Sequence, residues 1–378
     1  MIRFLGILAS LWILGSAVYP AQAGGLPQGV SAGVGFENGG HEATGPYKLL
    51  GYIQLNNKLG LGETLQIDTT NTSDLDEIEG VEVSVEKRFG DKWFANFSWA
   101  YDHTHPGGAT GRFFDQTTKN RAYLGSVNYY LASTEKLTAI ISSGVSYANT
   151  ETTKISKLLT GPTGFILPSE AFQQRTRDVN GSLALKYNAN EDVGIFASLS
   201  VSQGLDWDDP VSVRLGVDNT PTVYSASASY TRNLPKLFQL VVEGGAQWTP
   251  DRLNQQKMFS IGGSEYATAY RSGEQVGDVG AGFHVELNKL GVTKIGARGE
   301  VYYKPFVFFD GGITRIENPL PGETSGTQDE YSAGLGISLE ATNGMHAGAQ
   351  VAFPLTGGTI FENGDKEARL LFSVGWRK

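Results

Sequence analysis

Alternation of apolar and polar residues is the main pattern along this chain. In the final segment one face carries Ala368, Leu370, Phe372, Val374 and Trp376, and the other carries Glu367, Arg369, Ser373, Gly375 and Arg377, with Leu371 as the exception. A period of two residues is typical of a β-strand whose faces meet different surroundings. No segment beyond residue 23 holds the ~18 consecutive apolar residues expected of a membrane-spanning helix. The pattern predicts an all-β protein.

About 16 segments of this kind can be placed on the chain, many of them longer than the ~5–6 residues usual for strands. They lie near residues 28–37, 46–57, 62–72, 79–88, 92–102, 119–132, 135–150, 173–189, 192–205, 221–233, 237–250, 278–288, 294–310, 330–341, 345–355 and 367–378. Long alternating strands are typical of barrels that cross a bilayer. A water-soluble β-sandwich or β-helix is the disfavoured alternative.

The connections between these segments alternate in length. Short turns lie at 59–61, 89–91, 190–191, 234–236 and 342–344, and long connections lie at 103–118, 151–172, 206–220, 251–277, 311–329 and 356–366. Outer-membrane barrels have short periplasmic turns and long external loops. We therefore expect a transmembrane antiparallel β-barrel of about 16 strands, with both chain ends on the periplasmic side.

The register of one strand follows from its charges. Between residues 295 and 310, one face carries Ile295, Ala297, Val301, Tyr303, Val307 and Phe309, and the other carries Arg298, Glu300, Lys304 and Asp310. A shift by one residue would place a lysine or arginine in lipid, at a cost of roughly 2–4 kcal/mol at the bilayer midplane. The four charged residues are therefore predicted to face the lumen.

The N-terminus and the composition define the compartment and exclude several classes of function. Residues 1–23 have a short basic start, an apolar run and an Ala-Gln-Ala cleavage site, which predicts a secretory signal peptide. Residues 24–378 then form a single barrel domain. The chain has no cysteine and carries 30 Lys+Arg against 39 Asp+Glu, which excludes thiolate chemistry and disfavours nucleic acid as a partner.

Several short motifs resemble one family of secretion proteins. They are "ENGGHEATGPY" at 37–47, "NNKLGLGETL" at 56–65, "VSQGL" at 201–205, the segment 247–287, "PFVFFDGGI" at 305–313 and "AFPL" at 352–355. In order and spacing the chain resembles the barrel of TpsB-type two-partner-secretion transporters, the ShlB/FhaC/HecB-like haemolysin secretion/activation family. The resemblance implies an outer-membrane transporter, not an enzyme, that exports an unfolded polypeptide such as a haemolysin or an adhesin.

The resemblance also assigns a role to the long loop 251–277. In the family this loop folds into the lumen, and an arginine in its S-V-R-G-[FY] tip meets the aspartate of an F-x-D motif on the barrel wall. Here Thr268 and Ala269 replace the arginine and the glycine of the tip, and Tyr270 is kept. We hypothesise that Arg271 pairs with Asp310; the alternative, equally weighted, is that Arg271 faces water or another lumen acid. The loop residues implicated are Gly262, Gly263, Thr268, Ala269, Tyr270, Arg271, Gly277 and Asp278, and those of the wall are Phe308, Asp310 and Gly312.

A second departure from the family concerns its periplasmic POTRA domains, which bind the substrate by strand addition. The sequence has no room for them before the first strand, so the expected partners are outer-membrane lipid, a secreted polypeptide and a separate POTRA-like subunit. The alternative is a passive pore or an assembly factor on the same scaffold.

Three other groups of residues were weighed as sites. His284 and Glu286 share the lumen face of one strand, but no framed serine nucleophile accompanies them, so a polar wall is favoured over a hydrolase. His103 and His105 could hold a metal with Asp102 or Asp115, but no third ligand stands at motif spacing. The acidic stretch 206–210 is best explained as a solvated loop rather than a calcium site. No metal and no cofactor are expected.

Overall fold

The computed structural model describes residues 29–39, 47–72, 78–104, 114–156, 170–205, 214, 216–294, 299–321, 323, 326–356 and 367–378. The predicted signal peptide, His105, residues 206–210 and Arg298 lie outside these ranges. Within them, no helix has the length and apolar character needed to cross a membrane.

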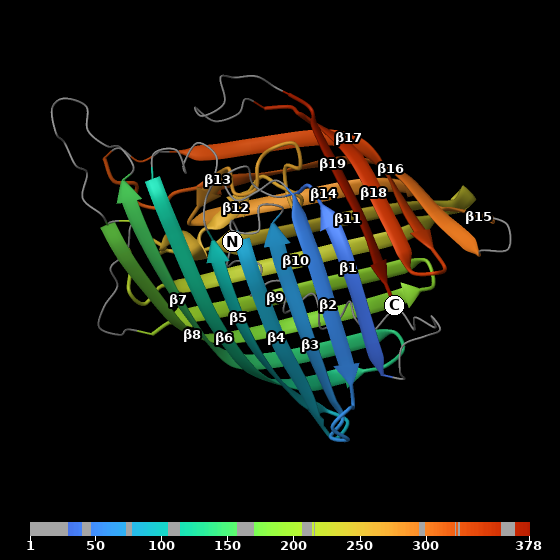
Figure 1. The fold of residues 1–378 in the computed structure, drawn as a ribbon, viewed down its shortest axis with the longest axis horizontal. Coiled ribbons are helices and arrows are strands. Elements are labelled where there is room, and N and C mark those ends of the chain that lie inside the picture. The colour runs from blue at the N-terminus through green and yellow to red at the C-terminus, as the bar shows by residue number, and fades with distance from the viewer. Residues whose placement is uncertain are drawn as a thin grey trace.

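The described residues form a β-structure in which strands follow one another around a wall (Figure 1). The wall strands are β1 (Val30–Glu37), β2 (Lys48–Asn56), β3 (Glu63–Thr72), β4 (Ile78–Phe89), β5 (Trp93–Thr104), β6 (Phe114–Ser133), β7 (Leu137–Ser156), β8 (Glu170–Asn190), β9 (Val193–Gly204), β10 (Thr222–Leu234), β11 (Phe238–Trp248), β14 (Val279–Lys289), β15 (Gly291–Lys294), β16 (Glu300–Arg315), β17 (Thr327–Ala341), β18 (Met345–Pro354) and β19 (Arg369–Arg377). A 3-10 turn, η2 (Pro235–Leu237), joins β10 to β11.

Neighbouring strands pair antiparallel, and β1 pairs with β19, which closes the sheet. Strands β14 and β15 both pair with β16, so they count as one strand of the barrel that is interrupted at Leu290. With β14 and β15 counted as one, the described residues make a closed antiparallel barrel of 16 strands, as the alternation of the sequence predicts. Closure leaves no sheet edge in the wall, and this is what a bilayer requires of a β-structure.

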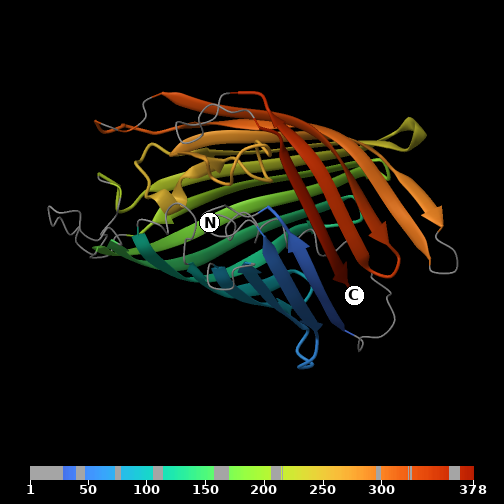
Figure 2. The ribbon, with the colours of Figure 1, turned by 45° about the horizontal axis from the view of Figure 1, so that its top comes forward.

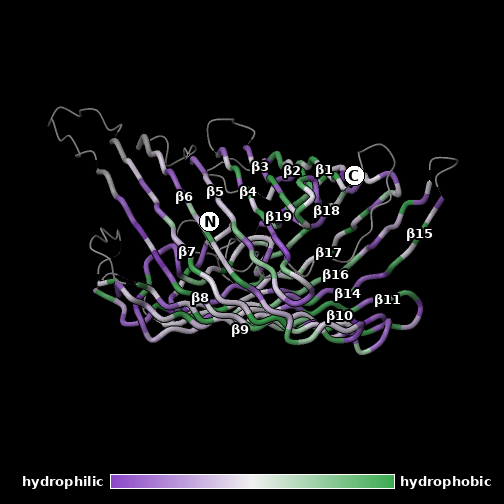
Figure 3. The backbone as a smooth tube through the Cα atoms, turned by 90° about the horizontal axis from the view of Figure 1, so that it is seen from below, coloured by the Kyte–Doolittle hydropathy of each residue, from purple (hydrophilic) through white to green (hydrophobic). Residues whose placement is uncertain are grey.

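The two faces of the wall differ as expected. Large apolar side chains such as Val127, Val145 and Leu335 are exposed on the outer face, and the polar residues alternate with them (Figure 3). In β19, Leu370, Phe372 and Val374 are exposed, whereas Leu371 is buried on the inner face with its polar neighbours. The outer face is therefore the lipid-facing one.

Aromatic pairs mark the two rims of the apolar band. Trp93 and Tyr129 stand with ring centroids 4.6 Å apart near the short turns. Tyr123 and Tyr147, 6.0 Å apart, lie at the rim of the long loops. Such girdles flank the lipid-facing band of outer-membrane barrels.

One predicted boundary is wrong. The predicted strand 294–310 is β16, which begins at Glu300 and continues to Arg315. Lys294 belongs to the preceding strand, β15. Gly299 precedes β16 and has φ 114°, a value that glycine adopts readily and other residues rarely do. The predicted strand begins too early because Ile295 and Ala297 continue the period of two in the sequence.

Candidate functional site in the lumen

The long segment between β11 and β14 folds back against the inner face of the wall. It contains η3 (Gln255–Lys257) and a hairpin of β12 (Phe259–Ile261) and β13 (Gln275–Gly277). Figures 1 and 2 show β12 and β13 enclosed by the wall strands. We refer to residues 249–278 as the lumen loop. It matches the predicted loop 251–277.

Glycines in the wall make room for the side chains of this loop. A Cβ on Gly280 would stand 2.3 Å from Phe259, and one on Gly282 would stand 2.4 Å from Tyr266. At Gly312 the clash would be with Ile261, at 2.6 Å. The spaces left by these three glycines are called glycine sockets here. They are filled by a buried cluster of Phe259, Ile261 and Tyr266. Gly312, which the family motif singled out, thus has a packing role.

The tip of the lumen loop is held by Asp310, which is fully buried. The backbone N–H of Thr268 donates to Asp310 at 3.1 Å, and the Thr268 hydroxyl donates to the same carboxylate oxygen. Ser332 on β17 donates to the second oxygen, and His284 Nδ1 stands 3.4 Å away on β14. Residues His284, Asp310 and Ser332 are register neighbours, so three strands converge on this contact.

Thr268 therefore makes the contact with Asp310 that the hypothesis gave to Arg271, and the pairing of Arg271 with Asp310 stays a prediction. Thr268, at the position of the family arginine, keeps the carboxylate contact with a hydroxyl and a backbone N–H. Ala267 has φ 58°, and this left-handed residue directs the Thr268 N–H towards the wall. The backbone N–H of Arg271 donates to the carboxylate of Glu274 at 3.0 Å. The tip of the loop thus contacts Asp310 through a hydroxyl and a backbone N–H.

Neighbouring residues extend the contact of the tip. The Tyr270 hydroxyl donates to the carbonyl oxygen of Thr356 at 2.7 Å, and Arg369 on β19 donates to the Tyr270 carbonyl at 2.6 Å. The Ala269 N–H donates to Ser332 at 3.3 Å. Gly262 and Gly263, with φ of 93° and 96°, let the two arms of the loop turn next to each other.

The other arm of the lumen loop reaches a different part of the wall. Gln256 donates to the Thr150 hydroxyl on β7, and Lys257 forms an ion pair with Asp178 on β8. Strands β7 and β8 lie across the barrel from β16 and β17 in the strand order. The lumen loop therefore spans the interior and is bonded to both sides.

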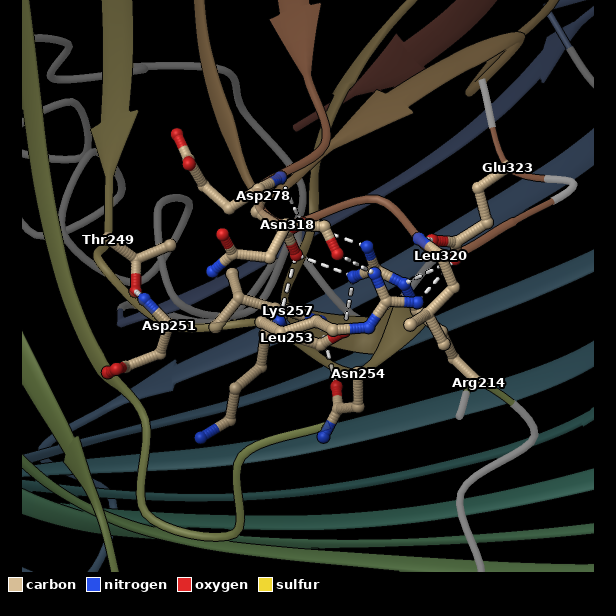
Figure 4. A network of polar contacts seen from close by, with 12 residues as sticks. Arg214, Thr249, Asp251, Leu253, Asn254, Lys257, Asp278, Asn318, Leu320 and Glu323 are labelled. Atoms are coloured by element: carbon tan, nitrogen blue, oxygen red, sulfur yellow. Dashed lines mark hydrogen bonds and ion pairs between the residues drawn. The ribbon is translucent and has the colours of Figure 1, made fainter. Parts of the chain in front are cut away.

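The base of the lumen loop is organised around a second carboxylate. Asp278 is fully buried and accepts a bidentate pair of hydrogen bonds from Arg214, at 2.6 and 2.9 Å. It also accepts from the N–H of Leu253 at 2.8 Å and from the N–H of Glu317 at 2.9 Å. Figure 4 shows Arg214 and Leu253 close to Asp278. Asp278 thereby joins the lumen loop to two connections on the same rim, 205–221 and 316–326.

Glu323 strengthens this junction. It accepts from Arg252 at 2.5 Å and from Arg214 at 3.3 Å. The hydrogen bond from Arg252 lowers the pKa of the Glu323 carboxyl from its usual 4.5 to about 2. Since the depressed pKa belongs to the folded state, this contact stabilises the junction above pH 4.5 and is lost as the pH falls towards 2.

Acidification is therefore expected to loosen the junction at the external rim. Between about pH 4.5 and pH 3 the segments around Arg214 and Glu323 should become increasingly sensitive to an acid-active protease added to intact barrels. In Glu323→Gln, which cannot titrate, cleavage should no longer depend on pH in this window. An unchanged pH dependence in that variant would assign the effect to another group.

The predicted polar wall is present on the strands that flank the tip. Lys304 lies 3.2 Å from Glu286, and His284 Nε2 lies 3.9 Å from the same carboxylate. Glu300 accepts from the Tyr302 hydroxyl at 3.2 Å at the opposite end of β16 from the tip. Phe308 stacks on His284 at 5.5 Å between ring centroids. Arg298 lies outside the described residues.

Sequence reasoning missed four residues of this site. Arg214, Arg252 and Glu323 lie in connections without regular structure, where no period reports their direction. Ser332 lies on the inner face of a strand that was predicted correctly. Alternation predicts that its side chain points inward, but not that it pairs in register with Asp310. Gly277 and Asp278 were included from the family motif, and Asp278 proves to organise the base.

Comparisons with known proteins agree with this architecture. The family model for the haemolysin secretion/activation protein ShlB/FhaC/HecB matches residues 27–341. The fold is similar to that of CdiB from Escherichia coli, with a TM-score of 0.77 at 16% identity over 94% of this chain and 64% of that one. CdiB from Acinetobacter baumannii gives 0.68 at 15% identity over 93% of this chain and 60% of that one.

A third barrel, BamA from Haemophilus ducreyi lacking POTRA domains 1–3, gives a TM-score of 0.62 at 15% identity, over 92% of this chain and 70% of that one. The chain therefore spans less than two thirds of the CdiB chains that it matches. No curated protein matches it in sequence.

Proposed function

The chain belongs to the haemolysin secretion/activation protein family ShlB/FhaC/HecB, and from this premise we propose that it translocates an unfolded polypeptide through its lumen. Family membership and the closed barrel place the chain in the bacterial outer membrane. The family is one of secretion proteins, in agreement with the expectation that the chain is not an enzyme. The substrate we propose is a large secreted protein such as a haemolysin or an adhesin.

The observation that carries the proposal is the double attachment of the lumen loop. The loop is bonded to β16 and β17 at its tip and to β7 and β8 by its other arm. A loop held in this way obstructs the interior in the resting state. A translocator with a wide lumen needs such an obstruction to keep the membrane sealed between transport events. The lumen loop is therefore proposed to be the gate.

The wall between the two attachment regions suits a moving polypeptide. The inner faces of β9 and β10 carry small hydroxyl residues: Ser198, Ser200, Ser202, Ser225, Ser227 and Ser229. Ser198 and Ser227 are hydrogen-bonded at 2.7 Å, and their outward neighbours Leu199 and Tyr224 are exposed. Hydroxyl groups can exchange hydrogen bonds with an extended backbone without the strong attachment that a row of charges would give.

Recognition before translocation is proposed to come from a separate periplasmic subunit. In the family, POTRA domains bind the substrate by strand addition, a mode in which the backbone supplies most of the affinity. The described residues of this chain form the barrel and the lumen loop. A POTRA-like subunit that binds the periplasmic turns would deliver the substrate.

The test compares proteins that are secreted or shaved from the surface of cells with and without this gene. One large protein should disappear from the exterior and accumulate in the periplasm. A chain without cysteine permits a sharper version, in which Ala269→Cys and Ser332→Cys are combined so that a disulfide locks the tip. Oxidised cells should lose export, and a reductant should restore it.

Each single-cysteine variant serves as the matched control, since it carries one new side chain but cannot form the lock. If no protein changes place in any strain, the barrel is a passive pore or an assembly factor, and the proposed function fails.

A further inference from the structure

Strands β6, β7 and β8 form the tallest part of the wall. They have 20, 20 and 21 residues, whereas β5 and β9 on either side have 12 each. Their ends extend past their neighbours at the rim of the long loops, and Figure 3 shows hydrophilic residues along the outer parts of β6 and β7. Because this rim is external, these ends stand beyond the outer surface of the membrane.

The outer face of this sheet can be followed row by row from its register. Val127 in β6, Val145 in β7 and Val179 in β8 are exposed and define the lipid-facing side. Two-residue steps towards the external rim lead to a row of Tyr123, Tyr147 and Arg177 and then to a row of Arg121, Asn149 and Arg175. Lys119, Glu151 and Gln173 form the next row.

These rows place cations directly beyond the aromatic girdle. Tyr123 and Tyr147 pack on each other, and the Arg177 guanidinium lies 5.5 Å from the Tyr147 ring centroid. One further step of two residues along a strand is a rise of ~7 Å, which brings Arg121 and Arg175 to the level of lipid headgroups. Lys119, Arg121 and Arg175 are all exposed.

These rows hold more cations than carboxylates. Glu151 is the acidic residue within these rows, and its carboxylate accepts hydrogen bonds from Asn149 at 3.0 Å and from Gln173 at 3.5 Å. Among the described residues no ion pair joins a carboxylate to Lys119, Arg121 or Arg175. Arg315, at the same rim on β16, differs because it forms an ion pair with Glu317. Lys119, Arg121 and Arg175 thus differ from Arg315, which has an acidic partner.

We propose that Lys119, Arg121 and Arg175 bind phosphate groups of a phosphorylated glycolipid in the outer leaflet. Guanidinium groups bind phosphate oxygens in pairs, and two of them across one strand can hold two phosphates of one headgroup. The apolar rows below would contact the acyl chains. A free anion would lack that contact, so the arrangement favours a lipid.

The bound lipid would act on the same strands that hold the lumen loop. Thr150 and Asp178 lie on the inner faces of β7 and β8, next to Asn149 and Arg177 on the outer faces. A headgroup that links β6 to β8 would therefore stiffen the part of the wall against which one arm of the loop rests. This inference rests on the outer-membrane location and does not require the proposed translocation.

The experiment measures the temperature at which the purified barrel loses its compact form on a gel, in an uncharged detergent. The probes are lipid A with two phosphates, the same lipid without phosphate, and inorganic pyrophosphate. The wild-type midpoint should rise by several degrees with the phosphorylated lipid and should not respond to the other two. Arg121→Gln with Arg175→Gln should lose most of that rise, and Arg175→Gln alone about half.

The control is Lys92→Gln with Lys136→Gln, which removes two exposed cations at the opposite rim and should keep the full rise. Equal midpoints without lipid establish that the variants fold. An equal rise with the lipid that lacks phosphate, an equal rise with pyrophosphate, or an undiminished rise in the double arginine variant would each overturn the proposal.

Discussion

Replacing Asp310 with alanine is expected to release the tip of the lumen loop and open the barrel. The carboxylate is buried and accepts hydrogen bonds from Thr268 and Ser332, with His284 beside it. Each hydrogen bond to a charged group contributes roughly 1.5–3 kcal/mol. Losing about 3 kcal/mol would raise the open population by roughly 10²-fold. Single-channel recordings in planar bilayers should show long, large openings that the wild type reaches only rarely.

Graded variants separate this explanation from a general loss of structure. Thr268→Val removes the hydroxyl but keeps the backbone N–H, so its effect should be intermediate. Combined with Asp310→Ala it should add little, because both changes remove one interaction. Arg271→Ala should behave as wild type at this contact. Wild-type openings in Asp310→Ala would contradict the role of the tip, and a strong effect of Arg271→Ala would support the pairing of Arg271 with Asp310.

Replacing Asp278 with alanine is expected to be the most destabilising change at the external rim. The substitution leaves Arg214 without its bidentate partner and leaves the N–H groups of Leu253 and Glu317 without acceptors. Breaking a buried ion pair by removing one partner typically costs 3–5 kcal/mol. Protease added to intact cells should cut the segments 216–221 and 316–321 at least tenfold faster than in the wild type.

The double variant Asp278→Ala with Arg214→Met provides the control, since it removes the uncompensated charge as well. Its cleavage rate should lie between those of the wild type and Asp278→Ala, because replacing both partners by apolar groups costs less than removing one. A double variant that is cleaved faster than the single one would show that Asp278 does not act through Arg214.

The barrel could be predicted from the sequence because a bilayer imposes a strict code on a strand. Every second residue must tolerate lipid, and every connection on one side is short, so both period and loop length report on the same architecture. The inward direction of Asp310 and Lys304 followed from the cost of placing charge in lipid. Alternation carries no information where the chain leaves the bilayer. For this reason the sequence predicted neither the boundary at Gly299 nor the positions of Arg214, Arg252 and Glu323.

The partner of Asp310 could not be predicted for a different reason. The expectation that a carboxylate needs a cation treats charge as the main requirement. A buried carboxylate is also stabilised by several neutral donors, and here a hydroxyl and a backbone N–H from Thr268 act together with Ser332. The backbone donor depends on the left-handed conformation of Ala267, which no sequence period reveals.

The glycine sockets of the wall determine the shape of the passage once the loop has left. At Gly280, Gly282 and Gly312 the inner wall is bare backbone, and at rest the cavity above it is filled by Phe259, Ile261 and Tyr266. If the loop withdrew, these three side chains would leave with it. The wall exposed behind them would carry no side chains at the glycine positions. The passage would therefore be wider beside these three glycines, by about the depth of one side chain, than it would be beside residues that carry one.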